Sequence, residues 1–267
     1  AECAELGGTC VNVGCVPKKL YSYAAGYAAA FEEAPGYGWT LPEAPRFDWA
    51  TLKRQRAQEI TRLNGVYQKL LDGAGVKTLT GWAQLVDGHT VSVSDTRYTA
   101  RHILVATGGM PAAPDMPGRE LAVVSDAMFD LPDFPKRLLV MGGGYIGCEF
   151  ASLFRGLGAH VTLVNRGAHI LNGFDDDVRE ALAREMGRQG IDLRMTAQVE
   201  TLRREGDGLV AMLSRGQQIE ADTVLLATGR KPNTAGMGLD AAGVKLDARG
   251  AVVVDAQYRS SVPHKWW

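Results

Sequence analysis

The chain has 267 residues, of which 46% are hydrophobic and 22% charged, with 32 glycines and a formal net charge of -1 at pH 7. This composition is typical of a globular protein rich in tight turns, with one large core or two smaller ones. The near-neutral charge offers no broad positive field, so nucleic acid and anionic membranes are not expected partners. The sequence has no apolar run near the roughly 18 residues of a membrane span and no basic-then-apolar leader.

Two cysteines lie five positions apart in residues 7–19, which read Gly-Gly-Thr-Cys-Val-Asn-Val-Gly-Cys-Val-Pro-Lys-Lys. In a regular helix, Cys10 and Cys15 would be separated by about 7.5 Å along the axis and would point about 140° apart. A disulfide between them therefore requires a bent backbone, which Gly14 permits. Pro17 and the two lysines indicate the opening turn of a helix, where positive charge and the helix N-terminus favour a reactive thiolate.

Other interpretations of this cysteine pair are a structural disulfide, half of a zinc site, or two inert thiols. Four cysteines are too few for a disulfide-stabilised secreted scaffold. A zinc site needs a second close pair, which Cys3 and Cys148 do not form. A redox pair is therefore favoured and no metal site is expected. A reactive dithiol without secretory features fits a reducing compartment, which predicts a cytoplasmic protein.

The segment after the motif predicts two helices and then a small sheet. Residues 20–31 are rich in Ala and Tyr and end at turn-forming residues. A second helix is expected over residues 48–71, with Asp48 as its N-cap. Tyr67 lies on its apolar face, and at this spacing a tyrosine is most often a core or rim residue. Residues 75–93 predict short antiparallel strands, and residues 101–106 predict an apolar strand.

A dinucleotide-binding pattern begins at residue 137. A buried strand at 137–141 is followed by Gly-Gly-Gly-Tyr-Ile-Gly at 142–147, which opens a helix, and by a second strand at 160–165. Glycines let the backbone approach a pyrophosphate, whose charge the helix N-terminus favours. A tight turn without ligand is the alternative, and the strand–glycine–helix–strand context makes it the weaker one.

The end of the second strand indicates which nicotinamide nucleotide binds. NAD-binding proteins usually place Asp or Glu there, whereas this chain has Asn165 followed by Arg166, which can pair with a 2′-phosphate. NADPH is therefore favoured. The helix after the glycines contains Cys148, expected to be a packing thiol, and Glu149, which needs a partner if it is buried. Further along, residues 174–189 predict a helix, 199–213 a hairpin and 223–227 a buried strand.

The cysteine motif closely resembles the active-site signature of the flavin-dependent disulfide reductases. Its Val-Pro-Lys-Lys ending is most similar to glutathione reductases, although thioredoxin and trypanothione reductases can share Pro-Lys-Lys. Lipoamide dehydrogenases and mercuric reductases usually have Pro-Ser-Lys there. The segment around Tyr67 and the Ala-Thr-Gly-Arg-Lys-Pro-Asn-Thr of residues 227–234 are also similar to glutathione reductases. Those enzymes often carry a second basic residue where Asn172 stands here, and we expect His169 to compensate.

The resemblance implies FAD and NADPH as cofactors, glutathione disulfide as substrate and a homodimer in the complete protein. It implies that Cys10 attacks the substrate, that Cys15 faces the flavin, and that Lys18 pairs with Glu149 beside it. Tyr145 corresponds to a residue that covers the flavin, and Tyr67 to one that touches glutathione. The implied cofactor-binding residues are Gly8, Thr9, Thr107, Gly108, Gly142, Gly144, Tyr145, Ile146, Gly147, Glu149, Arg166, Gly229 and Arg230.

The implied fold is α/β, with a partial FAD-binding domain into which a Rossmann-like NADPH-binding domain is inserted. We expect residues 1–117 and 235–267 to form the first domain and residues 118–234 the second. Members of the family begin with their own FAD fingerprint, whereas this sequence contains only the NADPH one. The alternatives are therefore a truncated, catalytically silent nucleotide-binding fragment, or another disulfide reductase (trypanothione, thioredoxin or mercuric reductase, or lipoamide dehydrogenase).

Overall fold

The computed structural model describes residues 1–262 and 265–266, and the part of the expected first domain at 263–264 and 267 lies outside the described residues. Internal contacts divide the chain into two compact units. Unit 1 comprises Ala1–Gly8, Leu63–Met110 and Arg230–Trp267, and unit 2 comprises Thr9–Arg62 and Pro111–Gly229. Each unit is described by itself. The expected division at residues 117 and 235 stays a prediction.

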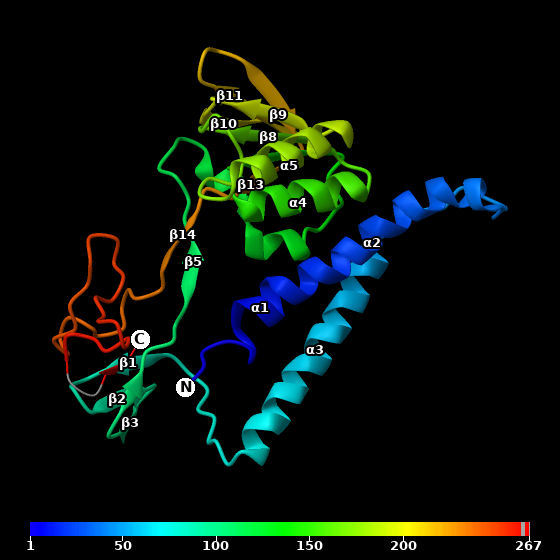
Figure 1. Ribbon diagram of the computed structural model, residues 1–267. Coiled ribbons are helices and arrows are strands. Elements are labelled where there is room, and N and C mark those ends of the chain that lie inside the picture. Colours follow the sequence, from blue (N-terminus) through cyan, green and yellow to red (C-terminus); the bar gives the residue numbers. More distant parts are fainter. Residues whose placement is uncertain (263–264, 267) are drawn as a thin grey trace. The chain divides into compact units, whose positions relative to one another are not determined.

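Unit 2 is built on a parallel sheet with the strand order β6-β13-β7-β8-β9 (Figure 1). Side chains of β7 point alternately to two faces: Leu138 and Val140 join one buried cluster, whereas Leu139 and Met141 join another. Both faces are therefore covered, which explains why the strand is apolar from Leu138 to Met141. The strands are β6 (Val123–Val124), β7 (Arg137–Met141), β8 (His160–Asn165), β9 (Asp192–Met195) and β13 (Thr223–Leu226).

Helices cover one face of this sheet and an antiparallel meander covers the other. The helices are α4 (Tyr145–Gly156) and α5 (Asp176–Arg188), which lie together in Figure 1. The meander consists of β10 (Val199–Glu205), β11 (Gly208–Leu213) and β12 (Gln218–Ala221). Two short 3-10 helices, η2 (Arg119–Leu121) and η3 (Ser125–Phe129), flank β6. The predicted α/β class with a parallel sheet is confirmed.

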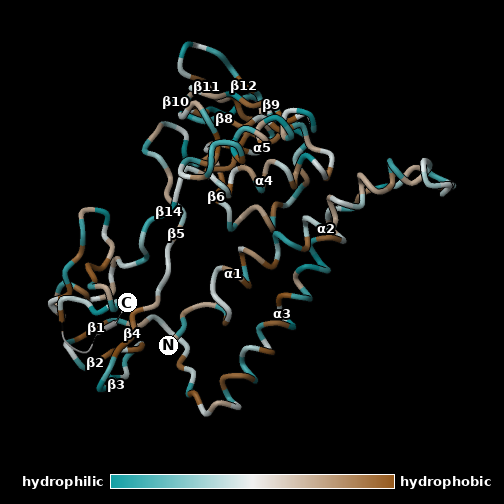
Figure 2. The backbone as a smooth tube through the Cα atoms, in the orientation of Figure 1, coloured by the Kyte–Doolittle hydropathy of each residue, from teal (hydrophilic) through white to brown (hydrophobic). Residues whose placement is uncertain are grey.

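The N-terminal helices also belong to unit 2, except for Gly8 at the start of α1 and the part of α3 after Arg62, which belong to unit 1. They are α1 (Gly8–Val13), α2 (Cys15–Glu33), η1 (Ala34–Tyr37) and α3 (Trp49–Gly73). The Asp48 carboxylate accepts the Thr51 N–H at 3.1 Å and so caps α3 as predicted. Along α3, hydrophilic and hydrophobic residues alternate (Figure 2). Helix α2 packs closely on α4. A Cβ atom on Gly156 of α4 would lie 2.9 Å from the Cβ atom of Ala25 of α2, so only glycine fits at this contact.

Four side chains of α2 and α3 donate hydrogen bonds to the carbonyl groups of residues 129–132. The phenol of Tyr21 and the guanidinium of Arg56 both donate to the Phe129 carbonyl at 2.8 Å. Trp49 donates to the Leu131 carbonyl at 2.9 Å, and Lys53 donates to the same carbonyl at 2.7 Å. These contacts fasten α2 and α3 to the segment that leads into β7.

Unit 1 has its own buried cluster around Leu85, Val105 and Leu239. Its antiparallel sheet contains β1 (Ala83–Leu85), β2 (Thr90–Val93) and β3 (Thr96–Thr99). The first two confirm the antiparallel strands predicted over residues 75–93, and β3 lies beyond that range. Two further strand pairs are parallel β4 (Ile103–Leu104) with β15 (Lys265–Trp266), and β5 (Gly109–Pro111) with β14 (Arg230–Pro232).

Five predicted elements differ in their bounds. The helices expected over residues 20–31 and 48–71 are α2 (Cys15–Glu33) and α3 (Trp49–Gly73). The strand expected over residues 101–106 is shorter, since β4 comprises Ile103–Leu104, which pair with β15. The helix expected from residue 174 begins at Asp176, since the Asp175 carboxylate accepts the Asp177 and Val178 N–H groups and acts as the N-cap. The strand expected to end at residue 227 ends at Leu226. Within residues 1–262 and 265–266, every helix is too short or too polar to cross a membrane.

Candidate active site

The disulfide joins Cys10 of α1 to Cys15, the first residue of α2, and their Cα atoms are 4.6 Å apart. Gly14 separates the two helices. A Cβ atom at Gly14 would lie 2.6 Å from the Thr9 carbonyl oxygen, so a larger residue would force the backbone apart. The bend that the sequence required at Gly14 is present, and it brings the two sulfur atoms together.

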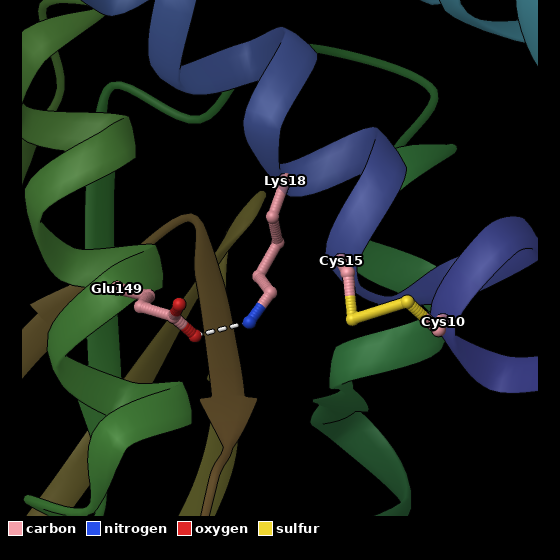
Figure 3. The surroundings of a disulfide bond; sticks show 4 residues. All are labelled: Cys10, Cys15, Lys18 and Glu149. Atoms are coloured by element: carbon pink, nitrogen blue, oxygen red, sulfur yellow. Dashed lines mark hydrogen bonds and ion pairs between the residues drawn. A yellow bond between two sulfur atoms is a disulfide. The ribbon is translucent and has the colours of Figure 1, made fainter.

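An ion pair lies beside the disulfide (Figure 3). Lys18 follows Cys15 by three residues on α2, so both side chains point to the same side of the helix. The Lys18 ammonium pairs with the Glu149 carboxylate of α4. The Lys18 side chain is 17% exposed and that of Glu149 is 46% exposed. The same ammonium lies 5.8 Å from the centroid of the Tyr145 ring. Glu149 therefore has the partner that the resemblance implied.

The ion pair lines a cavity of about 640 Å³ together with Cys15, Lys19 and the ring of Tyr145. Cys10 is not among the described residues that line it. The two cysteines thus differ in their surroundings: Cys15 adjoins the cavity that contains the ion pair, and Cys10 lies on the other side of the disulfide.

Cys148, next to Glu149 on α4, is buried and is not part of the disulfide. Burial, together with the nearby Glu149 charge, raises the pKa of the Cys148 thiol to about 11. Its Sγ donates to the Gly143 carbonyl at 3.6 Å. A neutral, hydrogen-bonded thiol of this kind is consistent with the expected packing role.

The glycine loop between β7 and α4 is shaped by close backbone contacts. A Cβ atom on Gly142, which has a φ of +112°, would lie 2.4 Å from the Ala227 carbonyl oxygen. One on Gly147 would lie 2.0 Å from the Gly142 carbonyl oxygen. Gly144, the N-cap of the twelve-residue helix α4, has open space in front of it and no side-chain cap. This arrangement leaves room and free N–H groups for a pyrophosphate, so the loop fits a dinucleotide.

A second cavity, of about 630 Å³, extends from Gly142 along the end of β8. Arg166, His169 and Asn172 line it and are exposed. Asn165 also lines it, but its amide is bonded to backbone groups: Oδ1 accepts the Gly143 N–H at 3.1 Å, and Nδ2 donates to the carbonyls of Gly167 and His169. The structure therefore brings the glycine loop and the predicted 2′-phosphate residue to one cavity.

The other predicted site residues are distributed over both units. Gly8, Tyr67, Thr107, Gly108 and Arg230 belong to unit 1, whereas Thr9, Ile146 and Gly229 belong to unit 2. The Thr107 hydroxyl donates to the Asn233 carbonyl at 2.8 Å, and the Arg230 guanidinium donates to the Gly109 carbonyl. Tyr67 is 40% exposed on α3, so its ring is not part of the unit 1 core.

Sequence reasoning missed three residues that line the nucleotide cavity: Arg179, Gln198 and Thr228. Arg179 lies on α5, where it donates to the Ile170 carbonyl at 2.9 Å and pairs with Asp176. An arginine in a charged helix has no sequence signal that sets it apart. Thr228 directly follows the strand predicted over residues 223–227, and this position at the end of a strand could have indicated it as a cavity residue. Among the described residues, no group of His, Cys, Asp and Glu is placed to hold a metal ion.

A Rossmann-type glycine loop and a disulfide on the neighbouring helix α2 define a dinucleotide-binding protein that carries a thiol–disulfide pair. The chain belongs to the pyridine nucleotide-disulphide oxidoreductase family, whose model matches residues 2–266.

Several curated proteins are similar in sequence to this chain. Glutathione reductase of Burkholderia cepacia is 46% identical over 98% of this chain and 58% of its own length. Chloroplastic/mitochondrial glutathione reductase of Pisum sativum is 41% identical over 98% of this chain and 48% of its own length. Mercuric reductase of Bacillus cereus is 36% identical over 95% of this chain and 41% of its own length. The chain thus spans about half the length of the relatives it matches.

A solved structure agrees in fold. The HOCl-induced flavoprotein disulfide reductase RclA from Escherichia coli is similar with a TM-score of 0.87 and 26% sequence identity. The similarity covers 98% of this chain and 57% of that one.

Proposed function

We propose that this chain is part of an enzyme that uses NADPH and FAD to reduce glutathione disulfide. The observation that carries the proposal is the cavity shared by Cys15, the Lys18–Glu149 pair and Tyr145. It adjoins the helix that begins at the nucleotide-binding glycines, so a reducible disulfide and a dinucleotide site belong to the same unit. The names of the Burkholderia and Pisum relatives support glutathione disulfide as the substrate.

The family resemblance assigns the cofactor-binding residues to the two nucleotides. For NADPH these are Gly142, Gly144, Ile146, Gly147, Arg166, Gly229 and Arg230, of which Gly142 and Arg166 line the nucleotide cavity. For FAD they are Gly8, Thr9, Thr107, Gly108, Lys18, Tyr145 and Glu149, of which Lys18, Tyr145 and Glu149 line the cavity beside Cys15. When bound, FAD supplies a two-electron relay between NADPH and the disulfide. Lys18 would place a positive charge beside the bound FAD. The ion pair with Glu149 holds the Lys18 ammonium in one place.

The chemistry assigned to the cysteines is thiol–disulfide exchange. In the reduced protein, the Cys10 thiolate attacks one sulfur of glutathione disulfide, forms a mixed disulfide and releases one glutathione thiolate. The Cys15 thiolate then attacks the Cys10 sulfur, restores the Cys10–Cys15 disulfide and releases the second glutathione. The dithiol loses two electrons and two protons, which the two glutathione thiols gain. Tyr67 is proposed to contact glutathione in the complete enzyme, which we propose is a cytoplasmic homodimer.

The test is to purify the chain, record its flavin spectrum and measure NADPH oxidation with glutathione disulfide. Bound FAD with glutathione-dependent turnover is expected of an enzyme that retains the complete site. Cys10→Ser should abolish turnover, whereas Cys3→Ser, a matched change at an exposed thiol outside the site, should leave it unchanged. Turnover retained in Cys10→Ser would overturn the assigned role.

A nucleotide-binding fragment without turnover is the second candidate, because the chain spans only 41% to 58% of the length of the three relatives described. Binding of NADPH without FAD and without turnover would support it. Comparing glutathione disulfide with trypanothione disulfide, thioredoxin, lipoamide and mercuric ion tests the substrate. The 36% identity to a mercuric reductase makes the mercuric ion comparison necessary.

A further inference from the structure

The Asn165 side chain connects the glycine loop to the loop that follows β8. Its Oδ1 accepts the Gly143 N–H at 3.1 Å, and its Nδ2 donates to the His169 carbonyl at 2.8 Å and the Gly167 carbonyl at 3.2 Å. Both amide hydrogens and one acceptor position are thus used within the protein. The carbonyls of Gly167 and His169 lie on either side of Ala168, so the amide holds the middle of this loop.

The backbone of Gly143 forms a second hydrogen bond with this loop. Its carbonyl oxygen accepts the Leu171 N–H at 2.7 Å, so the segment from Asn165 to Leu171 is attached to Gly143 at both ends. A Cβ atom on Gly143 would lie 2.8 Å from the Asn165 Cγ. The backbone of Gly143 does not have a positive φ, and the Gly-x-Gly-x-x-Gly pattern sets no residue at this position. The need for glycine here therefore comes from the Asn165 amide.

Arg166 begins the attached loop. It is exposed, lines the nucleotide cavity and forms no ion pair with a described carboxylate. A guanidinium on a flexible loop must lose conformational freedom to bind a phosphate, whereas one on a fixed loop loses less. The contacts of Asn165 are therefore placed to reduce that entropic loss.

We propose that Asn165 is a positioning residue for nucleotide selectivity: its amide fixes the loop of residues 166–169 so that Arg166 faces the 2′-phosphate of NADPH. The inference rests on the proposed NADPH-binding function and adds how the preference is set. In this arrangement Asn165 donates no hydrogen bond to the ribose, because both amide hydrogens are bonded to the protein. This differs from the acidic residue that occupies the same strand end in NAD-binding proteins and accepts ribose hydroxyls.

The test measures the dissociation constants of NADPH and NADH for the purified chain by fluorescence titration. The ratio of the two constants is compared between variants, because loosening of the glycine loop weakens the binding of NADPH and NADH alike and leaves the ratio unchanged. Arg166→Gln should reduce the preference for NADPH by roughly tenfold or more, the size of one hydrogen bond to a charged group. Asn165→Ala should reduce it by about threefold to tenfold, because the loop carrying Arg166 loses its attachment. Gln218→Ala, an exposed amide on β12 outside the cavity, is the matched control and should leave the ratio unchanged.

A double substitution shows whether Asn165 acts through Arg166. If it does, Asn165→Ala adds no further loss of preference when Arg166→Gln is already present. A residue that only stabilises the fold would lower both affinities in either background and leave the ratio unaltered. Equal losses of preference in both backgrounds, or an unchanged ratio in Asn165→Ala, would overturn the proposal.

Asn165→Asp separates positioning from direct ribose recognition. The new carboxylate can still accept the Gly143 N–H, but its second oxygen faces the carbonyl oxygens of Gly167 and His169. We therefore expect a weaker affinity for NADPH and no gain for NADH. A tenfold gain in NADH affinity would mean that the side chain turns to the ribose, and the proposal would be wrong. If the unsubstituted chain shows no preference for NADPH, the proposed cofactor fails instead, which distinguishes the two failures.

Discussion

The two cysteines outside the disulfide have opposite surroundings. Cys3 is exposed, whereas Cys148 is 4% exposed and bonded to the Gly143 carbonyl. Because burial raises the pKa of Cys148 from its ordinary value of 9.0 to about 11, this thiol stays protonated at the pH of ordinary labelling reactions. Iodoacetamide at pH 8 should therefore modify Cys3 and leave Cys148 unmodified in the folded protein.

The raised pKa of Cys148 also predicts how stability depends on pH. Between pH 9 and pH 11 the folded protein keeps the Cys148 proton and the unfolded chain loses it, so the contribution is complete below pH 9 and is lost as the pH rises. The loss is at most about 3 kcal/mol, from about two pKa units at 1.36 kcal/mol each. Urea unfolding across this range measures it. Cys148→Ala is the comparison, because it keeps every other titrating group and lacks only this one.

The prediction fails if Cys148→Ala shows the same decline as the unsubstituted chain. It also fails if Cys148 reacts at pH 8 as fast as Cys3, since a reactive thiol would contradict its burial.

Some individual residues were predictable from the sequence and others were not. The capping role of Asp48 was predictable, because an N-cap depends on a local contact, here with Thr51, three residues away. The bend at Gly14 was predictable, because the disulfide cannot form without it. The Lys18–Glu149 pair joins residues 131 positions apart, and only the family resemblance indicated it. The amide contacts of Asn165 had no sequence signal, because they depend on where the glycine loop lies in three dimensions.

At the scale of elements, the attachment of α2 and α3 to residues 129–132 includes one carbonyl that accepts hydrogen bonds from both helices. The Phe129 oxygen accepts from both Tyr21 and Arg56, and burial raises the pKa of the Tyr21 phenol. Arg56 is 7% exposed and also pairs with Asp130. Since the disulfide begins α2, this carbonyl helps to fix the helix that carries Cys15.

Single substitutions at this carbonyl are expected to be mild and the double substitution severe. Tyr21→Phe leaves the Arg56 bond in place and should lower the free energy of unfolding by about 1 kcal/mol. Arg56→Met leaves the Tyr21 bond but frees Asp130, and should cost about 1 to 3 kcal/mol. Together they leave a buried carbonyl without either donor, so the double variant should lose about 1 kcal/mol more than the sum of the two. Urea unfolding of the four proteins measures this coupling.

If the double variant loses only the sum of the two single losses in unfolding free energy, Tyr21 and Arg56 do not act on one shared carbonyl. Lys69→Met on the same helix α3 is a suitable control, because it removes a cation outside this contact and should change the free energy of unfolding little.

Periodic, locally determined elements were the most predictable. Strands β7 and β8 agree with their predicted bounds. Apolar residues occupy positions 138–141 of β7 and positions 161, 163 and 164 of β8, and each strand lies next to a glycine turn or loop. Strands β6, β9 and β12 were not predicted. They are two to four residues long, and their strand character comes from pairing with β13, β8 and β11, respectively. Strand β4 likewise pairs with a segment that is distant in the sequence.

At the scale of the whole molecule, the nucleotide cavity and the cysteine cavity belong to unit 2. The sequence placed the cysteine motif in a different domain from the glycine loop. The aromatic contacts of Tyr21 and Trp49 with residues 129–131, which pack α2 and α3 against the second half of unit 2, gave no sequence signal.

This grouping predicts where NADPH alters hydrogen exchange. NADPH should protect residues 142–147 and 165–172 of unit 2, because Gly142 at the start of the glycine loop and residues 165–169 and 172 line its cavity. Residues 83–99 of unit 1 should exchange at an unchanged rate and serve as the internal reference. At a hundred times the dissociation constant, the nucleotide should raise the free energy of unfolding by about 2.7 kcal/mol. Equal protection of both segments would contradict the assignment of the nucleotide site to unit 2.

The strand order of unit 2 has a consequence for synthesis on the ribosome. Strand β13 lies between β6 and β7, although β6 and β7 are close in sequence and β13 is made roughly 100 residues later. At about 5 to 20 residues per second, the facing edges of β6 and β7 stay without their partner for about 5 to 20 seconds. Unpaired strand edges can pair with another chain. The nascent protein should therefore depend on chaperones until β13 emerges and fills the gap.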